Sequence, residues 1–323
     1  MRNERLIALP LFAAGCAGPQ SALDPAGPAA ASIHQLGIVM YAGAAAVTLL
    51  VTVLMLVPFF RKRERSVNRE VFLWGGGVVL PLFSLTLLVP YVFMVGQGTR
   101  ASTAPDRLSI EVTGHLWWWN VSYRRADRSA AFASANELRL PAGEPVELLL
   151  RASDVIHSFW VPNLAGKTDM IPGRVNRMVL QADRTGDYRG QCAEYCGTQH
   201  ALMAFDVIVM PREEFDRWLN SLAQPVAEPK SEELQMGRAL FVKQGCGACH
   251  AVRGVASGTF GPDLTQVGAR RTLAAGTLPG GVGNIAAWIA SAQHLKPGNA
   301  MPSYDGLEGP QLRAMAAWLA SLK

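Results

Sequence analysis

Cysteine is scarce in this sequence, with five residues among 323, and the odd number excludes a framework in which every cysteine is disulfide-bonded. Four of the five form two close pairs, Cys192 with Cys196 and Cys246 with Cys249. Histidine is also scarce, with six residues, which leaves few sets of soft ligands to consider. Closely spaced cysteines in such a background indicate metal and cofactor sites.

A large excess of charge of one sign is missing as well. The net charge is +5 and the basic residues are scattered, which argues against a nucleic-acid partner. The sequence has no internal repeat of the solenoid kind, so a repeat architecture is excluded. Half of the residues are hydrophobic, and a chain of 323 residues is expected to form two or three domains.

The first sixteen residues, MRNERLIALPLFAAGC, predict a signal peptide. They begin with basic residues, continue with a short apolar run and end with small residues before a cysteine. This ending resembles a bacterial lipobox with Cys16 as the lipidated residue, although Ala13 stands where leucine is usual. The alternative is an uncleaved signal with a spare thiol, and the sequence leaves both open.

Two uncharged apolar runs, residues 36–60 and 71–95, are each long enough to cross a bilayer core of about 30 Å as a helix. The segment between them, RKRERSVNRE, is rich in basic residues, and short basic loops stay in the cytoplasm. We therefore expect a transmembrane hairpin over residues 36–95 in the bacterial inner membrane. Everything after about Gly96 would then be extracytoplasmic.

Residues 107–222 predict an all-β domain. The stretches LSIEVTG, NELRLP, PVELLLRAS, RMVLQA and FDVIVM are short, rich in β-forming residues and separated by turn residues, as in an antiparallel β-sandwich or barrel. PREEFDRWLNSL then predicts a short helix, and AQPVAEPKS a polar linker. Helical patterns return over residues 231–323, which predict a small all-α domain.

The stretch CGACH, residues 246–250, matches the motif for covalent attachment of haem c. Cys246 and Cys249 would form thioethers with the haem, and His250 would bind the iron. A thioredoxin-like dithiol is the alternative, but it needs a βαβ setting, whereas this motif lies in a region that predicts helices.

The second axial ligand is expected downstream, and Met301 in KPGNAMPSY is the main candidate. Met315 lies in an amphipathic helical pattern typical of a core, and His294 lies at a helix end typical of a surface. Residues 231–323 resemble a class I cytochrome c. That resemblance implies that the carbonyl of Pro262 contacts the ligand histidine and that Trp288 packs near the haem.

The stretch GQCAEYCGTQHALM, residues 190–203, has an unusual density of soft ligands. A structural zinc could use Cys192, Cys196 and His200 with a distant histidine, but the cysteine spacing is unusual for zinc and Met203 would have no role. Thioether ligands favour copper. Two thiolates, two histidines and a methionine suit two copper ions bridged by both sulfurs, and His157 is the best second histidine.

GHLWWWNVSY, DVIHSFWVPNLAGKTDMIPGR and GQCAEYCGTQHALM together resemble subunit II of cytochrome c oxidase, the subunit that carries the dinuclear copper centre CuA. With the cytochrome c domain, the resemblance is to the caa3 type and implies a cupredoxin-like Greek-key fold. Cys192 and Cys196 would bridge the coppers, and the other ligands would be His157, His200, Met203 and the Glu194 carbonyl. The Glu194 side chain would face a magnesium ion at subunit I, or else be a solvated loop charge.

The tryptophan run 117–119 has two interpretations. Alternating aromatic residues on a strand commonly fill a core, whereas the resemblance implies that electrons enter through Trp117. The sequence departs from the family pattern at Leu116 and Trp118, where glutamine and tyrosine are usual. Asp169 and Arg174 would contact subunit I by the same resemblance.

The resemblance implies the function. The chain would relay electrons from cytochrome c or another donor through haem c and CuA to subunit I, where oxygen is reduced to water, in a complex that also contains subunit III. Two alternatives stay open. One is the CuA subunit of a nitric oxide reductase, and the other is a copper carrier or zinc-stapled domain fused to a cytochrome.

Overall fold

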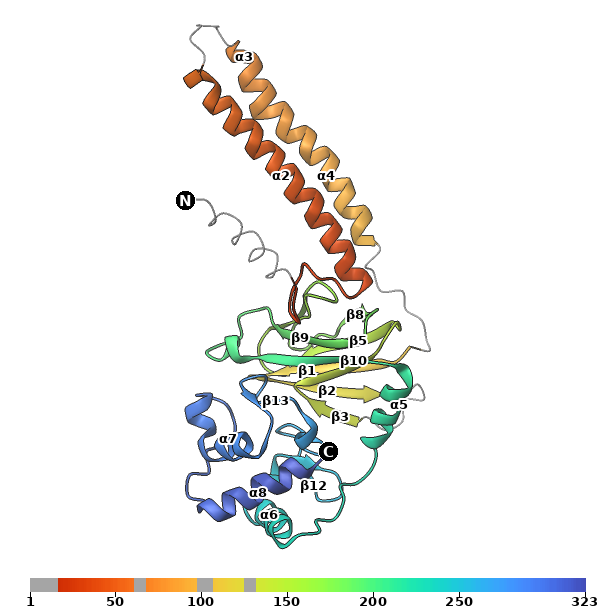
Figure 1. Cartoon of the computed structure of the whole chain (residues 1–323), viewed down its shortest axis with the longest axis vertical. Helices are drawn as coiled ribbons and strands as arrows, with labels where there is room; N and C mark the ends of the chain where they lie inside the picture. Colours follow the sequence, from red (N-terminus) through yellow and green to blue (C-terminus); the bar gives the residue numbers. More distant parts are fainter. Residues whose placement is uncertain (1–16, 61–67, 98–106, 125–131) are drawn as a thin grey trace, which may run out of the picture.

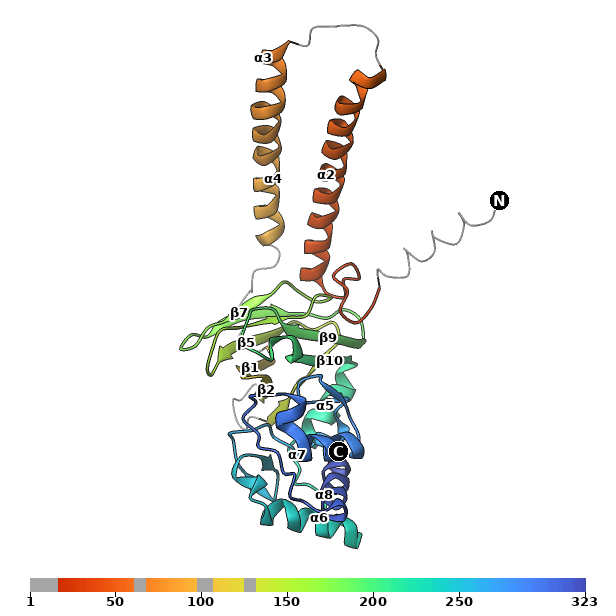
Figure 2. The ribbon, with the colours of Figure 1, turned by 90° about the vertical axis from the view of Figure 1, so that its left-hand side faces the viewer.

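The computed structural model describes residues 17–60, 68–97, 107–124 and 132–323. A helical hairpin, a β-sandwich and a small helical domain follow one another along the longest axis (Figure 1). The sandwich lies between the other two, as Figure 2 shows from the side. The signal segment 1–16 and most of the basic segment, residues 61–67, lie outside the described residues, so lipidation at Cys16 and the sidedness of the hairpin stay predictions.

Both apolar runs form helices. The first, α2 (Pro28–Phe60), begins earlier than the apolar run, because proline fits the first turn of a helix. The second comprises α3 (Arg69–Val71), a π-helical stretch η1 (Phe72–Val79) that contains three glycines, and α4 (Leu80–Gln97). An 18-residue window of each helix has a mean hydropathy of 2.3 and contains no buried residue, as expected of a membrane anchor.

The segment before the first helix is irregular but closely packed on the sandwich. The Ala26 amide donates to the Asn163 carbonyl at 2.7 Å, and the Asn163 side chain donates to the Asp24 carbonyl at 2.9 Å. Gly27 approaches the Gln181 carbonyl so closely that a Cβ would lie 2.2 Å from its oxygen. These contacts fasten the membrane hairpin to the β-domain on the side opposite the helical domain (Figure 2).

Two five-stranded sheets form the sandwich. The first contains, in spatial order, β3 (Phe132–Ala135), β2 (Trp118–Arg124), β1 (Ser109–His115), β5 (Val146–Ala152) and β8 (Asn176–Leu180). The second contains β4 (Glu137–Pro141), β10 (Ala204–Met210), β9 (Gly186–Cys192), β6 (His157–Trp160) and β7 (Thr168–Met170). Alternate residues of β1 and β5 are buried, so the inner faces of the sheets make the core.

The expectation of a purely antiparallel sandwich is wrong at two places. Strand β1 pairs with β5 in parallel, and β4 pairs with β10 in parallel. The chain leaves the first sheet after β3 to place β4 in the second and returns with β5, so the returning strand runs in the same direction as β1. Greek-key crossovers of this kind join strands far apart in sequence, and short strand patterns alone do not reveal them.

The C-terminal domain is built on helices. After the short helix α5 (Arg212–Ser221) come α6 (Glu232–Lys243), η3 (Cys246–Ala248), η4 (Val267–Ala269), α7 (Val282–Leu295) and α8 (Gly309–Ser321). Two small hairpins, β11 (Ala251–Val252) with β12 (Ala256–Ser257) and β13 (Thr272–Leu273) with β14 (Leu278–Pro279), were not expected from the helical patterns. Helices α6 and α8 cross at Gly237, where a Cβ would lie 2.1 Å from the Ala314 carbonyl oxygen.

The linker between the β-domain and the helical domain is not a free tether. The Val226 amide donates to the Arg253 carbonyl at 3.0 Å, and Pro225 lies against Gly254. The helical domain itself contacts the sandwich through several polar pairs, among them Arg271 with Asp187 at 2.6 Å. The two domains are therefore docked on each other.

Candidate functional site

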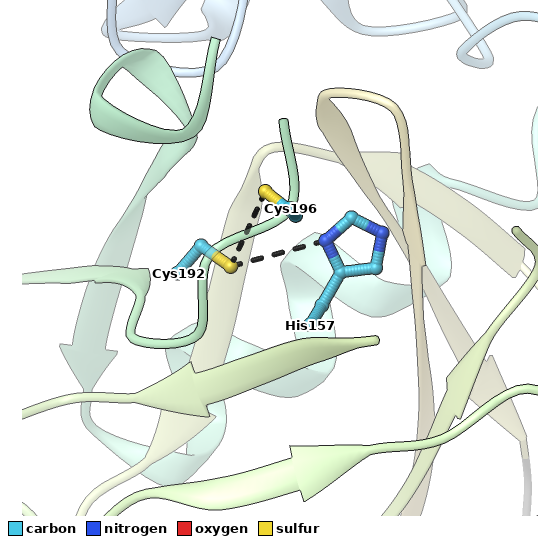
Figure 3. Close-up of side chains that lie close together, drawn as sticks. All are labelled: His157, Cys192 and Cys196. Atoms are coloured by element: carbon cyan, nitrogen blue, oxygen red, sulfur yellow. Dashed lines mark hydrogen bonds between the residues drawn. The ribbon is translucent and has the colours of Figure 1, made fainter. Parts of the chain in front are cut away.

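Strand β9 ends at Cys192, and the loop that follows returns to β10 immediately after Met203. The Cys192 and Cys196 sulfurs lie 3.8 Å apart, and the Nδ1 atom of His157 lies 3.8 Å from the Cys192 sulfur. His157 reaches the loop from β6, the neighbour of β9 in the second sheet (Figure 3). These three side chains are buried, and their ligand atoms lie within 4.8 Å of one another.

The other donors expected from the sequence surround the same two sulfurs. The Nδ1 atom of His200, in the short helix η2 (His200–Leu202), lies 3.6 Å from the Cys196 sulfur, and the Met203 sulfur lies 3.8 Å from it. The carbonyl oxygen of Glu194 is 3.2 Å from the Cys192 sulfur. The structure thus brings together two thiols, two imidazoles, a thioether and a carbonyl.

The orientation of His157 is set by a carboxylate that the sequence reasoning missed. His157 is the first residue of β6, and its Nε2 atom is 2.8 Å from an oxygen of Asp154. Burial is the largest single influence and disfavours charge on His157, but the hydrogen bonds and charges of Asp154 and Cys192 together raise the pKa of the ring. A carboxylate on one ring nitrogen leaves the other free to bind a metal. The spacing D-x-x-H in SDVIHSFW is the signal that could have identified Asp154.

The two thiols perturb each other. The hydrogen bond between the two thiols, with a further contribution from His157, lowers the pKa of Cys192, although burial acts in the opposite direction. The same pairing with Cys192, together with burial, raises the pKa of Cys196. One thiolate therefore forms readily, and binding of a soft cation would favour loss of the second proton. Buried sulfur and imidazole donors fit copper, and Met203 has a role that zinc would not give it.

The second set of ligands lines an apolar cavity in the helical domain. Cys246, Cys249 and His250 lie on one side of it, and Met301 and Trp288 also line it. The Nδ1 atom of His250 is 2.8 Å from the carbonyl oxygen of Pro262, so Nε2 is the nitrogen left for iron. Burial lowers the pKa of His250, which keeps the ring neutral as a ligand must be.

The alternatives to Met301 are placed differently. His294 is exposed and is not among the described residues that line the cavity. Met315 lines the cavity but is buried within α8 as part of the helical core. The Met301 loop is held by the Asn299 side chain, which accepts from the Met301 amide at 2.8 Å, and by Gln293, which donates to the Met301 carbonyl at 2.6 Å. These contacts hold the loop that brings Met301 to the cavity, which favours Met301 over His294 and Met315 as the second axial ligand.

Comparison with known proteins identifies the family. Residues 125–210 match the family model described as the periplasmic domain of cytochrome c oxidase subunit II, and residues 234–323 match that of cytochrome c. Cytochrome c oxidase subunit 2 of Alkalihalophilus pseudofirmus is 37% identical over 98% of this chain and 95% of its own length. The chain belongs to the cytochrome c oxidase subunit II family.

Further relatives agree. Cytochrome c oxidase subunit 2 of Bacillus subtilis is 32% identical over 100% of this chain and 99% of its own length. The solved periplasmic domain of subunit II from Bradyrhizobium japonicum is 30% identical and covers 36% of this chain and 93% of its own, with a TM-score of 0.34. As a member of this family by its curated relatives, the chain is part of a haem-copper cytochrome c oxidase, a respiratory oxidoreductase complex. Its two matched domains imply CuA copper and haem c.

In this subunit II, Trp117 lies between the two sites. Its indole nitrogen donates to the Cys196 carbonyl at 2.8 Å, while its ring lines the haem-side cavity with Leu116 and Trp118. Trp117 is 8% exposed, and its ring is close to Gly197 in the loop 193–203 between β9 and β10, the copper loop, where a Cβ on Gly197 would lie 3.0 Å from the ring. Trp117 is thus packed in the core, as the first interpretation of the tryptophan run expects, and it also contacts both the loop of Cys196 and the haem-side cavity.

Charged residues expected to face other subunits lie on the surface. Lys167 pairs with Asp169 at 3.0 Å and with Glu194 at 3.1 Å, and all three side chains are about half exposed. Arg174 is exposed in the turn after β7. Strand β7 lies on the side of the sandwich that faces the membrane hairpin (Figure 2).

Proposed function

We propose that this subunit receives electrons from a cytochrome donor on its C-terminal domain and delivers them through its β-domain to subunit I, where oxygen is reduced. The domains would be residues 36–95 as anchor, 107–222 as copper domain and 231–323 as haem domain. The loop at 61–67 would face the cytoplasm, and the two globular domains would be extracytoplasmic. Uncovered apolar helices and a family model of a periplasmic domain support this arrangement.

The two groups of ligands would hold one-electron carriers. When bound, haem c and CuA each accept and release a single electron. The haem would be attached through Cys246 and Cys249 and bound axially by His250 and Met301. The copper ligands would be His157, Cys192, Glu194 through its carbonyl, Cys196, His200 and Met203. Buried soft ligands fixed by a rigid scaffold change position little, which suits repeated oxidation and reduction.

The position of Trp117 is the observation that carries the proposal. One residue lines the haem-side cavity and also donates a hydrogen bond at 2.8 Å to the carbonyl of Cys196. Trp117 would therefore provide a direct route between the domains, and electrons would enter the copper domain there. Membership of the oxidase family favours this relay over the nitric oxide reductase alternative and over a copper carrier.

The Glu194 carboxylate would face a magnesium ion at the border with subunit I. The Glu194 side chain is exposed on the copper loop, and this exposure supports the proposal. Lys167 is its partner within this chain, so docking of subunit I would have to separate or share that pair. We propose subunits I and III as the partners in the membrane.

Metal counting and paramagnetic resonance on the purified full chain test the copper assignment. We expect two copper ions per chain and a signal from one unpaired electron shared between them. Zinc in place of copper, or a single copper with a mononuclear signal, would contradict the proposal. Cys196→Ser should abolish the shared signal while leaving the haem absorption unchanged.

A further inference from the structure

A buried lysine lies where the two domains meet. Lys296 follows α7 in the helical domain, and only 2% of its surface is exposed. Its ammonium group donates to three backbone carbonyls, those of Trp117 at 2.9 Å, Leu202 at 2.7 Å and Ala274 at 2.9 Å. Two of these carbonyls belong to the β-domain and one to the helical domain.

The three carbonyls match the chemistry of the ammonium group. An ammonium has three donors and no acceptor, so three carbonyls satisfy it completely. No carboxylate pairs with Lys296 among the ion pairs of the described residues. A buried charge is costly unless its hydrogen bonds are made, so the arrangement is stable only while all three segments stay in place.

The segments that Lys296 joins are the ones between the two cofactor sites. Leu202 precedes the copper-loop methionine, and Trp117 bonds to the Cys196 carbonyl. Lys296 also opens the stretch KPGNAM, which ends at Met301 on the haem side. Next to it, Pro297 accepts a hydrogen bond at 2.8 Å from Gln199 of the copper loop.

The turn that supplies the third carbonyl is strained. Ala274 and Ala275 have φ values of 52° and 60°, which residues with a side chain rarely adopt. The Ala275 carbonyl accepts from the amide of Ala204, at the start of β10, at 3.0 Å. Strained backbone persists only where its surroundings hold it, and here the surroundings are the docked β-domain and Lys296.

We propose that Lys296 is a positioning residue for electron transfer between the domains, whose ammonium fixes Trp117 and the copper loop against the haem-side cavity. This inference rests on the proposed relay and adds the group that sets its geometry. Lys296 lines the haem-side cavity, but its ammonium hydrogen bonds go to the carbonyls of Trp117, Leu202 and Ala274 and not to a proposed cofactor ligand. It acts by holding Trp117 through its carbonyl, while the indole nitrogen of the same residue holds the copper loop.

The test compares Lys296→Met with Arg271→Met in the full chain loaded with haem and copper. Both changes remove a cation from the interface, but Arg271 is half exposed, and its ion pair within the described residues is with the equally exposed Asp187. After photoreduction of the haem, we expect copper reduction to slow about tenfold or more in Lys296→Met, since small displacements of reacting groups have large effects on rate. The rate should also become dependent on solvent viscosity, while the haem and copper spectra stay unchanged.

Arg271→Met should stay within about twofold of the natural chain, because exposed ion pairs contribute little. An unchanged transfer rate in Lys296→Met would overturn the proposal. Slower transfer with altered copper or haem spectra would also overturn it. The lysine would then change a metal site itself, and not the position of one site relative to the other. If the natural chain itself shows no electron transfer from haem to copper, the proposed relay is wrong, and the role of Lys296 falls with it.

Lys296→Gln provides a second variant and a readout that needs no cofactor. Glutamine keeps two donors but is shorter and neutral. We expect hydrogen exchange at the Ala204 amide, which bonds across the interface, to accelerate about tenfold as the docked state opens more often. Exchange at strand amides inside the sandwich should be unchanged. Equal exchange at Ala204 in both proteins would show that Lys296 does not hold the interface.

Discussion

The copper site and the haem cavity are two metal sites built in opposite ways. The sandwich gathers every proposed copper ligand around the two buried sulfurs of Cys192 and Cys196. In the helical domain the proposed ligands instead stand around an apolar cavity, with Cys249 exposed and Met301 half-buried. The fold itself brings the proposed copper ligands together. The core of the helical domain, in contrast, contains a cavity that the haem would fill.

The difference follows from the layers that surround each site. The copper loop connects two strands of a ten-stranded sandwich whose core is filled by its own side chains. The helical domain is smaller, and its core residues Phe241, Ile289 and Met315 also line the cavity. A small domain with an open core lacks the burial that stability requires. The two domains should therefore depend on their cofactors to different degrees.

Loss of the haem attachment should have the largest effect. In Cys246→Ala with Cys249→Ala, the cavity would be left unfilled, and unfilled apolar cavities are strongly destabilising. We expect loss of helical circular dichroism and rapid proteolysis within residues 231–323, with the β-domain intact. If the C-terminal domain of this variant resists protease as well as that of the natural chain does, the helical domain does not depend on its haem for folding.

Met301→Ala should keep the domain folded but change the iron. The haem would remain attached through its thioethers, and the absorption spectrum should lose the features of six-coordinate, low-spin iron. Met315→Leu is the matched control, because Met315 lines the same cavity from α8 and leucine preserves its packing. A normal spectrum in Met301→Ala would transfer the axial role to Met315 or His294.

Asp154→Ala should weaken the copper site by a smaller amount. The carboxylate orients His157 through a hydrogen bond of 2.8 Å, and loss of such a partner typically lowers metal affinity about 10–100-fold. Competition with a calibrated chelator measures the change. Asp183→Ala, at an exposed position of the same domain, should leave affinity unchanged. Equal affinities in the two variants would mean that packing alone orients His157.

Removal of copper should have the smallest effect on the fold. The donors are already within hydrogen-bonding range of one another, so the sandwich should keep its strands and its β-type circular dichroism without metal. The free energy of unfolding should fall only by the amount that copper binding to the folded state adds to it. Unfolding of the β-domain after chelation would show that the site is not preformed.

The sequence predicted which residues gather at the proposed copper site better than it predicted the contacts between domains. Cys192, Cys196, His200 and Met203 are close in the chain, so their spacing was informative, and His157 followed because histidines are few. A short motif such as CGACH can be recognised in the same way, because its functional residues are close together in the sequence.

Long-range features could not be predicted in this way. The parallel pairing of β1 with β5 depends on a crossover, and the polar linker predicted from the sequence gave no sign that the helical domain docks on the sandwich. Lys296 gave no signal, because a lysine before a proline and a glycine is typical of a solvated turn. Its burial depends on three carbonyls contributed from positions far apart in the chain.

Flash reduction of the haem in the isolated full chain, without subunit I, tests whether the two sites form one relay. We expect the copper absorption to fall as the haem is reoxidised, at a rate that does not depend on protein concentration, because the docked domains exchange electrons within one molecule. A rate proportional to protein concentration, or copper that stays oxidised while the haem remains reduced, would contradict the relay through Trp117.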